Sequence, residues 1–466
     1  MNSLIKIIFA LLILLISGCD YNKKEEDLKK PNIVMIIADD LGYSQLGCYG
    51  SNYYKTPNLD DLANTGMRFT NAYSAAAVCS PTRASIVTGK YPARLNITDY
   101  IPGDKNSSNL LEIPEWQKYL PLEELTIGEL LREEGYKTAW FGKWHLSKSK
   151  QPPESIENNP VNQGFDESFI TYKPNVQAPI KDWQTPENDG HNVEILTNKS
   201  IDFIDRNKEN PFFLVISHNT IHDPLMEKAD LIEKYRSLEA TNEPENHVTI
   251  AAMIETLDNS VGRIIKKINQ SKIDNNTIII FYSDNGGRDK YAKQTPFRKG
   301  KGWLYEGGIH VPLIISYKGV IVPNSVNDQL VSSIDFFPTF YDFSSTKPDQ
   351  KLTFDGLSLS PLLLGEKVTL RKNLYWNYPH YHSSGMKPAA AMRSGDFKLI
   401  EWYEAKYLGN QKVYELYNLV DDPGEKNDLS SKFPEKVNGL KHLLEEWKID
   451  VNAQEPSINK NYSADN

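Results

Sequence analysis

The chain has 466 residues, a formal net charge of −9, and a composition that is 39% hydrophobic and 24% charged. This composition fits a folded core and excludes a mainly disordered protein, and the negative charge argues against a nucleic-acid-binding surface. The length exceeds that of one average domain, so we expect a large α/β domain and a smaller second one.

The first 30 residues are predicted to target and tether the protein. Residues 7–16 form an apolar run that is shorter than the ~20 residues a membrane-spanning helix needs. The run leads into Ser17-Gly18-Cys19, which resembles the lipobox of bacterial lipoproteins, where the cysteine is lipidated. An ordinary signal peptide with an incidental cysteine is the alternative. We expect a signal peptide over 1–19, a charged tether over 20–30, and a lipid on Cys19 that anchors the protein in the bacterial envelope, facing the periplasm or the cell surface.

Four apolar runs, at 33–38, 138–142, 212–217 and 277–283, predict buried strands of an α/β sheet covered on both faces. Each run is followed by polar residues that suit a binding site: Asp39 and Asp40, Lys143 and His145, His218 and His222, Asp284 and Asn285. Ligands of open α/β sheets bind beyond the carboxyl ends of the strands. We therefore expect these polar residues to form one site.

The intervening segments predict helices and a second domain. Thr126 and Glu129 form a capping box that opens a helix ending near Gly135, and residues 253–268 predict another helix. A catalytic domain is expected over 31–360, with a passage between domains at 346–365. Over 361–466 the pattern predicts a small antiparallel sheet with a closing helix, formed by strands near 374–376, 397–400 and 413–417 and a helix at 436–447.

Cys79 begins the pentapeptide Cys-Ser-Pro-Thr-Arg. Ser80 suits the N-cap of a helix, Pro81 its first turn and Gly89 its end. Cys79 is therefore expected at a helix N-terminus, which favours an anion, with Arg83 one turn further along. Two alternatives remain open: a buried structural thiol, or a disulfide between Cys79 and Cys48.

The pentapeptide resembles the C-x-P-x-R signature of type I sulfatases, and the resemblance continues through residues 84–95. Further stretches resemble that family in the expected order: 31–42, 142–145, 283–287, 300–308, 355–363 and 414–422. The resemblance implies an alkaline phosphatase-like fold, with a large mixed sheet flanked by helices, and hydrolysis of sulfate esters. It also implies that a maturase oxidises Cys79 to formylglycine.

The family's residue roles can be placed on matching positions of this chain. One Ca²⁺ is implied, and hard cations of this kind prefer oxygen ligands; the implied ligands are Asp39, Asp40, the residue derived from Cys79, Asp284 and Asn285. By the same resemblance, Arg83 and Lys143 hold the hydrated aldehyde and His145 takes its proton. His222 and Lys301 bind the sulfate and protonate the leaving oxygen.

Substrate contacts are less clearly marked. His380, His382, Asp99 and Arg298 are candidates for binding the sugar, with an ordinary surface loop as the alternative for the two histidines; His191, His247 and His310 are interpreted as structural. The richness in Lys, Asn and Ile suggests an AT-rich genome, and together with the lipid anchor it favours a bacterium that degrades sulfated algal polysaccharides such as ulvan or carrageenan. The alternatives are a glycosaminoglycan sulfatase, a phosphoesterase of the same superfamily, and a catalytically dead glycan-binding lipoprotein.

Overall fold

The computed structural model of the protein describes residues 30–104, 109–148, 157–171, 192–344, 352–409 and 411–462. Pro31–Asn466 group into one unit, so the boundary expected at residue 360 separates two sheets within that unit. The expected signal peptide, Cys19, nearly all of the tether and His191 lie outside the described residues. In the described part of the chain, no helix is both long and apolar enough to span a membrane.

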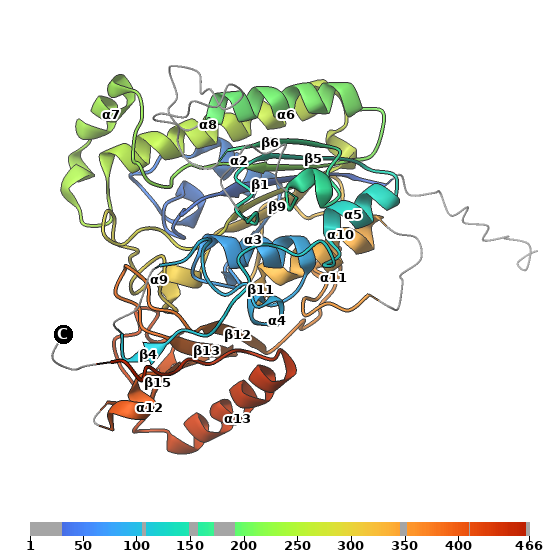
Figure 1. Cartoon of the computed structure of the whole chain (residues 1–466). Coiled ribbons are helices and arrows are strands. Elements are labelled where there is room, and N and C mark those ends of the chain that lie inside the picture. The colour runs from blue at the N-terminus through green and yellow to red at the C-terminus, as the bar shows by residue number, and fades with distance from the viewer. Residues whose placement is uncertain are drawn as a thin grey trace, which may run out of the picture. The chain divides into compact units, whose positions relative to one another are not determined.

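An eight-stranded sheet forms the centre of this unit (Figure 1). Its strands, in spatial order, are β10 (Ser325–Asn327), β2 (Met67–Phe69), β9 (Leu313–Tyr317), β8 (Thr277–Ser283), β1 (Asn32–Ala38), β7 (Phe212–Ser217), β5 (Lys137–Gly142) and β6 (Glu167–Ile170). β1 pairs in parallel with both β7 and β8, whereas β9 runs antiparallel to β8 and β2. The predicted mixed sheet is confirmed, and the four apolar runs are β1, β5, β7 and β8.

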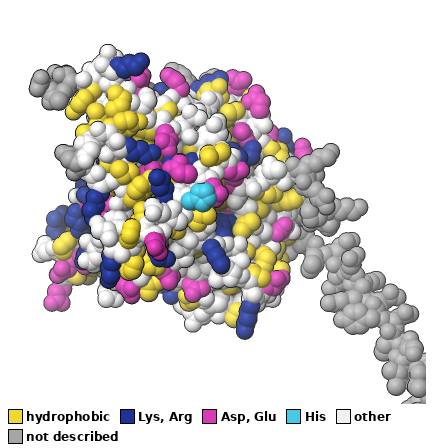
Figure 2. Space-filling model, turned by 90° about the horizontal axis from the view of Figure 1, so that it is seen from below, with side chains coloured by type: hydrophobic (Ala, Val, Ile, Leu, Met, Phe, Trp, Pro, Cys, Tyr) yellow, Lys and Arg dark blue, Asp and Glu magenta, His cyan; other side chains and the backbone are white. Residues whose placement is uncertain are grey.

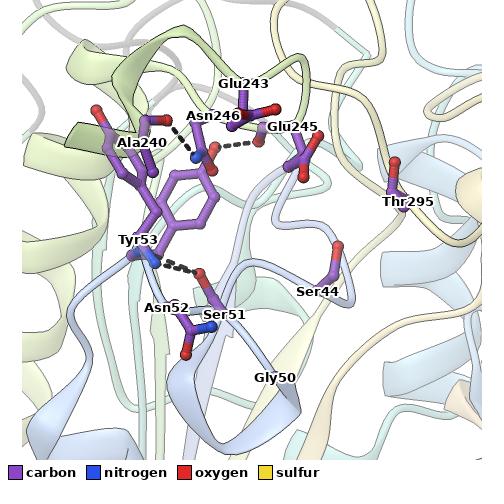
Figure 3. A pocket seen from close by; sticks show the side chains of 11 residues that line it. Ser44, Gly50, Ser51, Asn52, Tyr53, Ala240, Glu243, Glu245, Asn246 and Thr295 are labelled. Atoms are coloured by element: carbon purple, nitrogen blue, oxygen red, sulfur yellow. Dashed lines mark hydrogen bonds between the residues drawn. The ribbon is translucent and has the colours of Figure 1, made fainter. Parts of the chain in front are cut away.

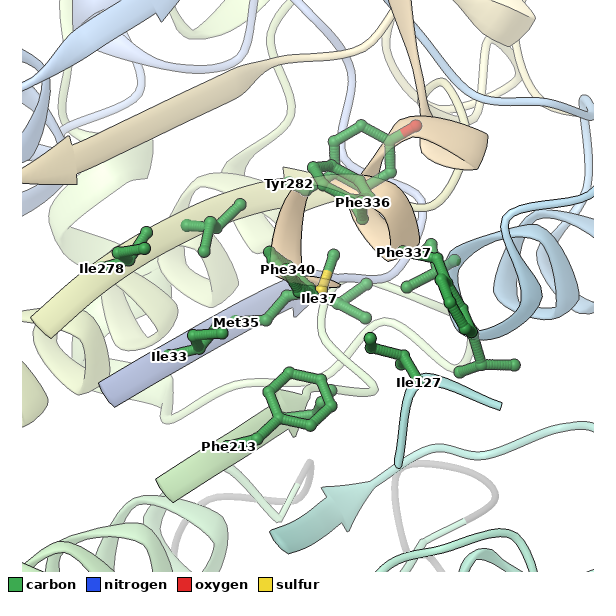
Figure 4. Close-up of a cluster of buried hydrophobic side chains, with 14 of the residues drawn as sticks. Ile33, Met35, Ile37, Ile127, Phe213, Ile278, Tyr282, Phe336, Phe337 and Phe340 are labelled. Atoms are coloured by element: carbon green, nitrogen blue, oxygen red, sulfur yellow. The ribbon is translucent and has the colours of Figure 1, made fainter. Parts of the chain in front are cut away.

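Helices cover both faces of this sheet (Figure 1). One layer contains α2 (Pro57–Thr65), α6 (Val193–Asn207), α7 (Ala229–Arg236) and α8 (Val248–Gln270); the other contains α3 (Cys79–Thr88), α5 (Ile127–Glu133), α10 (Phe336–Ser344) and α11 (Ser360–Leu363). Alternate side chains of β1 enter the two cores. Ile33 and Met35 pack with Phe336 on one side (Figure 4), while Val34 and Ile36 lie in the core of the α8 layer. Because both faces are buried, the strands are apolar throughout instead of alternating.

One of the two helices predicted between the strands agrees with the structure and the other is longer than predicted. The capping box of Thr126 and Glu129 is present at the start of α5. The helix predicted over 253–268 is longer, because His247 accepts the N–H of Ile250 and caps α8 five residues earlier. The remaining short elements are β3 (Ala72–Tyr73), β4 (Leu111–Glu112), β11 (Val331–Ser332), β16 (Ser457–Ile458), α4 (Pro92–Leu95), α9 (Glu306–Ile309), α12 (Ala405–Leu408), η1 (Gly47–Tyr49), η3 (Pro160–Asn162), η4 (Glu239–Asn242), η5 (Asp274–Asn276) and η6 (Ser333–Asp335).

A second, antiparallel sheet is built from the C-terminal segment. It contains β12 (Asn373–Tyr378), β13 (Ala389–Ser394), β14 (Phe397–Trp402) and β15 (Tyr414–Asn418), and α13 (Pro434–Asp450) packs on one face. The other face packs against Ala77 and Val78, next to Cys79, and against Leu304 and Tyr305, next to Lys301. The second sheet therefore supports two segments of the site. Its predicted architecture is confirmed, although β13 was not expected from the sequence.

Charges of both signs are mixed on the face of the molecule that carries α13. Figure 2 shows lysine and arginine side chains interspersed with aspartate and glutamate over this face. Among the described residues seen in this view, they do not merge into the continuous basic surface typical of nucleic-acid-binding proteins.

Candidate active site

The polar residues that follow β1, β5 and β8 converge at one edge of the main sheet. β1 lies between β7 and β8, and β5 lies beside β7, so the carboxyl ends of these parallel strands are neighbours. One ligand atom from each of Asp39, Asp40, Cys79 and Asp284 lies within 4.8 Å of the others. All four side chains are buried, at 1% exposure or less. The expected site is thus assembled from segments up to 245 positions apart in the chain.

Cys79 occupies the first position of α3, and Val78 takes the N-cap position without a capping side chain. The predicted N-cap role of Ser80 is wrong, because its hydroxyl accepts the backbone N–H of Ile101 instead. The Cys79 Sγ lies 3.6 Å from Asp39 Oδ1 and 3.3 Å from Lys301 Nζ. Both described cysteines are free, which rules out the disulfide alternative. Burial raises the pKa of the Cys79 thiol to about 12, although the charges of Lys143 and Lys301 act to lower it.

Each buried carboxylate of the site has a cationic partner. Lys143 Nζ lies 2.6 Å from Asp39 Oδ2, and Lys301 Nζ lies 2.6 Å from Asp40 Oδ1. Burial by itself would raise the pKa of Asp40, but the neighbouring cations, Lys301 foremost, hold that pKa far below its usual range. Burial would likewise lower the pKa of Lys301, and the Asp40 carboxylate raises it instead. The two groups are therefore both charged at neutral pH.

Arg83 completes the set of three cations against three carboxylates. Its Nη2 lies 2.7 Å from Asp284 Oδ2, and its Nη1 donates to the backbone oxygen of Lys143 at 2.7 Å and to Ser217 Oγ at 2.5 Å. The guanidinium is 0% exposed. It thus fixes the end of β8 relative to the ends of β5 and β7, because an arginine presents several donors in one rigid plane.

Asn285 provides a test of whether these residues suit a metal ion. Its Nδ2 donates to Asp40 Oδ1 at 2.8 Å, while its Oδ1 is buried and has no hydrogen-bond partner among the described residues. A buried amide oxygen left without a donor is costly unless something else satisfies it. Together with the carboxylates of Asp39, Asp40 and Asp284, it makes a set of hard oxygen donors, which fits a Ca²⁺ ion.

The hydrogen bond of His145 identifies which ring nitrogen carries its proton. Nε2 lies 2.7 Å from the carbonyl oxygen of Ile101, so Nε2–H is the donor and Nδ1 carries the lone pair. Nδ1 is buried and unpartnered among the described residues. Burial, reinforced by the charge of Lys143, holds the pKa of His145 well below its ordinary value. His145 is therefore a neutral imidazole with a free basic nitrogen, as its predicted role requires.

His222 also belongs to the cluster. Its Nδ1 donates to the carbonyl oxygen of Asp223 at 2.8 Å, and its Nε2 lies 4.0 Å from Asp40 Oδ2. Burial, followed by the charges of Lys301 and Lys143, lowers the pKa of His222 to about 3. In the neutral form, Nδ1 carries the proton and Nε2 has none to donate to a sulfate. An anion beside the ring would raise the pKa of the imidazole and so favour the protonated form, which can donate. His218, the other histidine considered for this position, is buried with Nε2 3.4 Å from Ser260 Oγ.

One site residue, Arg288, was missed by the sequence analysis. Its Nη1 lies 2.8 Å from Asp223 Oδ2 and 3.8 Å from Asp40 Oδ2, and its side chain is 23% exposed. The sequence offered one indication of a role for Arg288: it directly follows the stretch 283–287 at the end of β8.

Comparison with known proteins decides the family. Residues 31–345 match the family model described as Sulfatase. The chain belongs to the sulfatase family. The predictions of a type I sulfatase with the alkaline phosphatase fold, and of a sulfuric ester hydrolase, are thereby confirmed. A second model, the C-terminal part of N-sulphoglucosamine sulphohydrolase, matches residues 298–450 of this sulfatase.

Similar proteins cover nearly the whole chain. A sulfatase of Formosa agariphila is 32% identical over 96% of this chain and 94% of the relative. An N-acetylgalactosamine-6-O-sulfatase of Bacteroides thetaiotaomicron is 28% identical over 94% of this chain and 97% of the relative. The crystal structure of Ps i-CgsB in complex with k-i-k-neocarrahexaose superposes with a TM-score of 0.75 at 26% identity, covering 93% of this chain and 95% of that one.

Two predicted sugar contacts of the sulfatase, Asp99 and His380, lie together but are buried. They are 2% and 1% exposed, and His380 Nε2 is 2.8 Å from Thr98 Oγ1. Tyr378 donates its hydroxyl to Asp99 Oδ1 at 2.8 Å. The surface-loop alternative is therefore wrong for His380. Both side chains support the loop whose Ile101 carbonyl orients His145.

The other two candidates lie in different surroundings. His382 packs closely over Gly302, since a Cβ built on that glycine would lie 2.2 Å from His382 Nδ1. The imidazole therefore lies beside the residue that follows Lys301. Arg298 instead lies over the ring of Tyr305 at 4.0 Å and donates to the carbonyl oxygen of Glu425 at 2.8 Å. It lines a cavity of about 690 Å³ together with Lys293, Lys299 and Lys426. Arg298 thus connects the segment after β8 to the C-terminal sheet.

A separate cavity of about 280 Å³ lies near the start of α8 (Figure 3). It is lined by Ser44, Gly50, Ser51, Asn52, Tyr53, Tyr54, Ala240, Glu243, Glu245, Asn246 and Thr295. Its two charged side chains, Glu243 and Glu245, are acidic and disfavour a sulfated ligand. This cavity is therefore distinct from the sulfatase site.

Proposed function

We propose that this sulfatase removes sulfate esters from a sulfated carbohydrate, using a formylglycine formed from Cys79 and one Ca²⁺ ion. The substrate we favour is an algal polysaccharide of the carrageenan or ulvan type, or its oligosaccharides. The similarity to Ps i-CgsB, crystallised with k-i-k-neocarrahexaose, supports that class. The similarity to an N-acetylgalactosamine-6-O-sulfatase supports a glycosaminoglycan as the second candidate.

The observation that carries the proposal is the surroundings of Cys79. Its thiol lies at a helix N-terminus between Asp39 and the ammonium of Lys301, and it is 1% exposed. With the pKa raised to about 12 by burial, the unmodified thiol is protonated at neutral pH and is a poor nucleophile. A buried cysteine that is unreactive as a thiol suits a position that becomes active only after chemical modification.

The chain's own groups can then be given roles. When present, a hydrated formylglycine at position 79 would supply the oxygen nucleophile, and Ca²⁺ held by Asp39, Asp40, Asp284 and Asn285 would supply positive charge. Lys143 and Lys301 place two ammonium groups beside that position and stabilise negative charge on the sulfate. Arg83 fixes the position of Asp284 relative to the end of β5.

Proton transfer falls to the histidines and Lys301. His145 keeps Nδ1 unprotonated because Nε2–H is engaged by Ile101, so Nδ1 can accept a proton from the residue at position 79. His222 Nε2 and Lys301 Nζ approach the carboxylate of Asp40, and from there they contact the sulfate and the leaving oxygen. The sugar alkoxide is a poor leaving group, so a proton donor at that oxygen lowers the barrier.

Mass spectrometry of the purified, active enzyme tests the modification. The peptide containing position 79 should carry formylglycine in place of cysteine, and Cys79→Ala should lose turnover of an aryl sulfate by at least about 10⁴-fold while unfolding at an unchanged temperature. Cys48→Ala is the matched control, because Cys48 is the other described free cysteine. An active enzyme with unmodified Cys79 contradicts the proposal.

Metal analysis tests the ion separately. The purified protein should contain one calcium per chain, and chelation should abolish turnover until calcium is restored. Chelation should also lower the unfolding temperature, because a ligand that binds only the folded state stabilises it. Two zinc ions per chain would favour the phosphoesterase alternative.

We further propose that Cys19 is lipidated and anchors the enzyme in the bacterial envelope, and that a maturase acts on Cys79 during export. The motif Ser17-Gly18-Cys19 after an apolar run supports the anchor. Labelled palmitate should be incorporated in the native host and lost in Cys19→Ala, which should release active enzyme in soluble form. Unlabelled wild-type protein would refute the anchor and leave the proposed chemistry intact.

A further inference from the structure

Arg288 is charged, partly exposed and next to the site, and none of the roles above uses it. Its side chain is 23% exposed, and both Arg288 and His222 approach the same oxygen, Asp40 Oδ2, at 3.8 and 4.0 Å. Asp40 itself is 0% exposed. Arg288 and His222 therefore lie between the buried carboxylates and solvent, where a bound sugar has to enter.

The backbone holds Arg288 in a fixed relation to Lys301. The carbonyl oxygen of Gly287 accepts the N–H of Lys301 at 2.8 Å, and the carbonyl oxygen of Arg288 accepts the N–H groups of Tyr291 and Ala292 at 3.0 and 3.2 Å. The guanidinium consequently extends from a rigid turn. A rigid support is the arrangement that precise ligand contacts require.

The partner of Arg288 can release it at little cost. Asp223 Oδ2 lies 2.8 Å from Arg288 Nη1 and also 3.5 Å from Lys290 Nζ. Asp223 is 27% exposed, and Lys290 is 55% exposed. A partly exposed ion pair of this kind adds little to stability, and Asp223 keeps Lys290 as a partner when Arg288 turns to a ligand.

The charges at this position favour an anion. Arg288 and Lys290 face the carboxylate of Asp223. Asp40, the other carboxylate near Arg288, is paired with Lys301, which leaves an excess of one positive charge. His382 packs over Gly302, next to Lys301, so its ring borders the same opening, and the charges of Lys301 and Arg288 act to lower its pKa. Asp104, the acidic residue on that side, is engaged by the hydroxyl of Tyr100 and by the N–H of Ser383.

We propose that Arg288 binds a second anionic group of the substrate, a sulfate ester or a carboxylate, on the sugar that carries the scissile sulfate or on its neighbour. The inference rests on the proposed function, since it places the scissile sulfate beside Cys79. A guanidinium pairs with such groups through two parallel hydrogen bonds, which a lysine cannot reproduce. Arg288 thereby makes the enzyme selective for multiply charged saccharides.

The test uses three substrates: an aryl sulfate, a monosulfated oligosaccharide, and the same oligosaccharide with a second sulfate or with a uronate. The wild-type enzyme should prefer the doubly charged oligosaccharide in kcat/KM by about 10- to 100-fold, mainly through KM. Arg288→Gln should abolish that preference, and Arg288→Lys should retain only part of it. Lys290→Gln, which removes a cation from the same carboxylate, should keep the preference within about threefold. The arm that is preferred, sulfate or uronate, identifies the anionic group.

Binding measured without turnover gives an independent readout. In the Cys79→Ala background, calorimetry should show tighter binding of the doubly charged oligosaccharide, and this difference should disappear when Arg288→Gln is added. Equal losses on all three substrates for Arg288→Gln would overturn the inference and make Arg288 a support for Asp40. A wild-type enzyme that turns over both oligosaccharides equally well would also overturn it. A wild-type enzyme that hydrolyses no sulfate ester would instead refute the proposed function.

Discussion

Two clusters of acidic and basic side chains lie in different parts of the molecule. In the C-terminal part, Lys448 Nζ lies 2.7 Å from Glu401, 2.8 Å from Glu445 and 2.6 Å from Glu455. An ammonium has three donors, so this lysine is fully satisfied. The three glutamates have the spacing of a metal site, yet the lysine occupies their centre.

In the cluster at the ends of β1 and β8, the charges are paired but two buried polar atoms lack a hydrogen-bond partner among the described residues. Its three carboxylates pair with three cations. Nevertheless, Asn285 Oδ1 and His145 Nδ1 have no hydrogen-bond partner among the described residues. A folded protein rarely leaves buried polar atoms unpaired unless a ligand or a reaction uses them. Both clusters have the acidic spacing of a metal site, but of the two only the one at the ends of β1 and β8 contains unpaired buried atoms among the described residues.

Neutralising one acid in each cluster should produce the largest difference in activity between two variants. Asp40→Asn should lower kcat/KM by about 10³-fold, because it removes a charge that orients Lys301 and an oxygen that the proposed Ca²⁺ would use. Glu401→Gln should leave kcat/KM within about twofold and lower the unfolding temperature. Both are measured with an aryl sulfate and by thermal melting. Comparable losses of activity in the two variants would contradict the distinction drawn between the clusters.

A second pair of variants compares two buried lysines of the C-terminal part. Lys398 Nζ lies 2.9 Å from Glu306 and 2.9 Å from Glu425, and Glu425 accepts the N–H of Glu306 at 2.7 Å. This network clamps the segment that carries Lys301. Lys398→Met should cost about 3 kcal/mol of stability, because it leaves the buried carboxylate of Glu425 without its cation. Lys448→Met should cost less, because Glu401 keeps Lys406 as a partner and the other two glutamates are partly exposed.

Only Lys398→Met should also weaken inhibition by inorganic sulfate, by about 10-fold, because only that lysine positions Lys301. Denaturant unfolding and inhibition kinetics separate the two effects. Unchanged sulfate inhibition in Lys398→Met would show that the clamp serves the fold alone.

The pH dependence of stability should reveal the buried state of His380. Burial, with a contribution from Lys118, lowers the pKa of His380 in the folded protein to about 3, whereas the ordinary value is 6.5. Below pH 6.5 the unfolded chain binds a proton that the folded protein does not, so stability falls as the pH drops from 6.5 toward 3. The slope from this residue approaches ~1.4 kcal/mol per pH unit, or about 2 kcal/mol lost at pH 5.

His380→Asn should reduce the difference in stability between pH 7 and pH 5 by about that amount, as measured by denaturant unfolding at the two pH values. His442→Asn is the control, because His442 is 74% exposed. Equal pH dependence in wild type and His380→Asn would mean that His380 is protonated in the folded protein.

The smallest effect is expected at His382. Because it borders the opening next to Lys301, His382→Ala should lower activity on a sulfated oligosaccharide by about 10-fold and leave aryl sulfate turnover within about twofold. His380→Ala should lower both activities together, because His380 supports the loop that orients His145. Identical behaviour of the two variants on both substrates would remove the distinction between these histidines.

The sequence predicted the sheet and the core of the site because both depend on local patterns. Apolar runs that end in polar residues mark buried parallel strands and place their end residues at one edge. The strand β13 was not expected, because its three alanines have low β-propensity. It forms because small side chains fit between β12 and β14 and the cores on either side.

The sequence by itself determined the residue types of the proposed chemistry: the candidate nucleophile, the candidate oxygen donors and the cations. Only the tertiary structure decided how those residues are used. Ser80 supports Ile101 instead of capping α3, His145 takes the tautomer that Ile101 imposes, Asp99 and His380 are buried, and Arg288 reaches the opening. The reason is physical. Burial and hydrogen-bond partners come from segments far apart in the chain, and they set protonation and exposure, whereas local sequence sets only which groups are present.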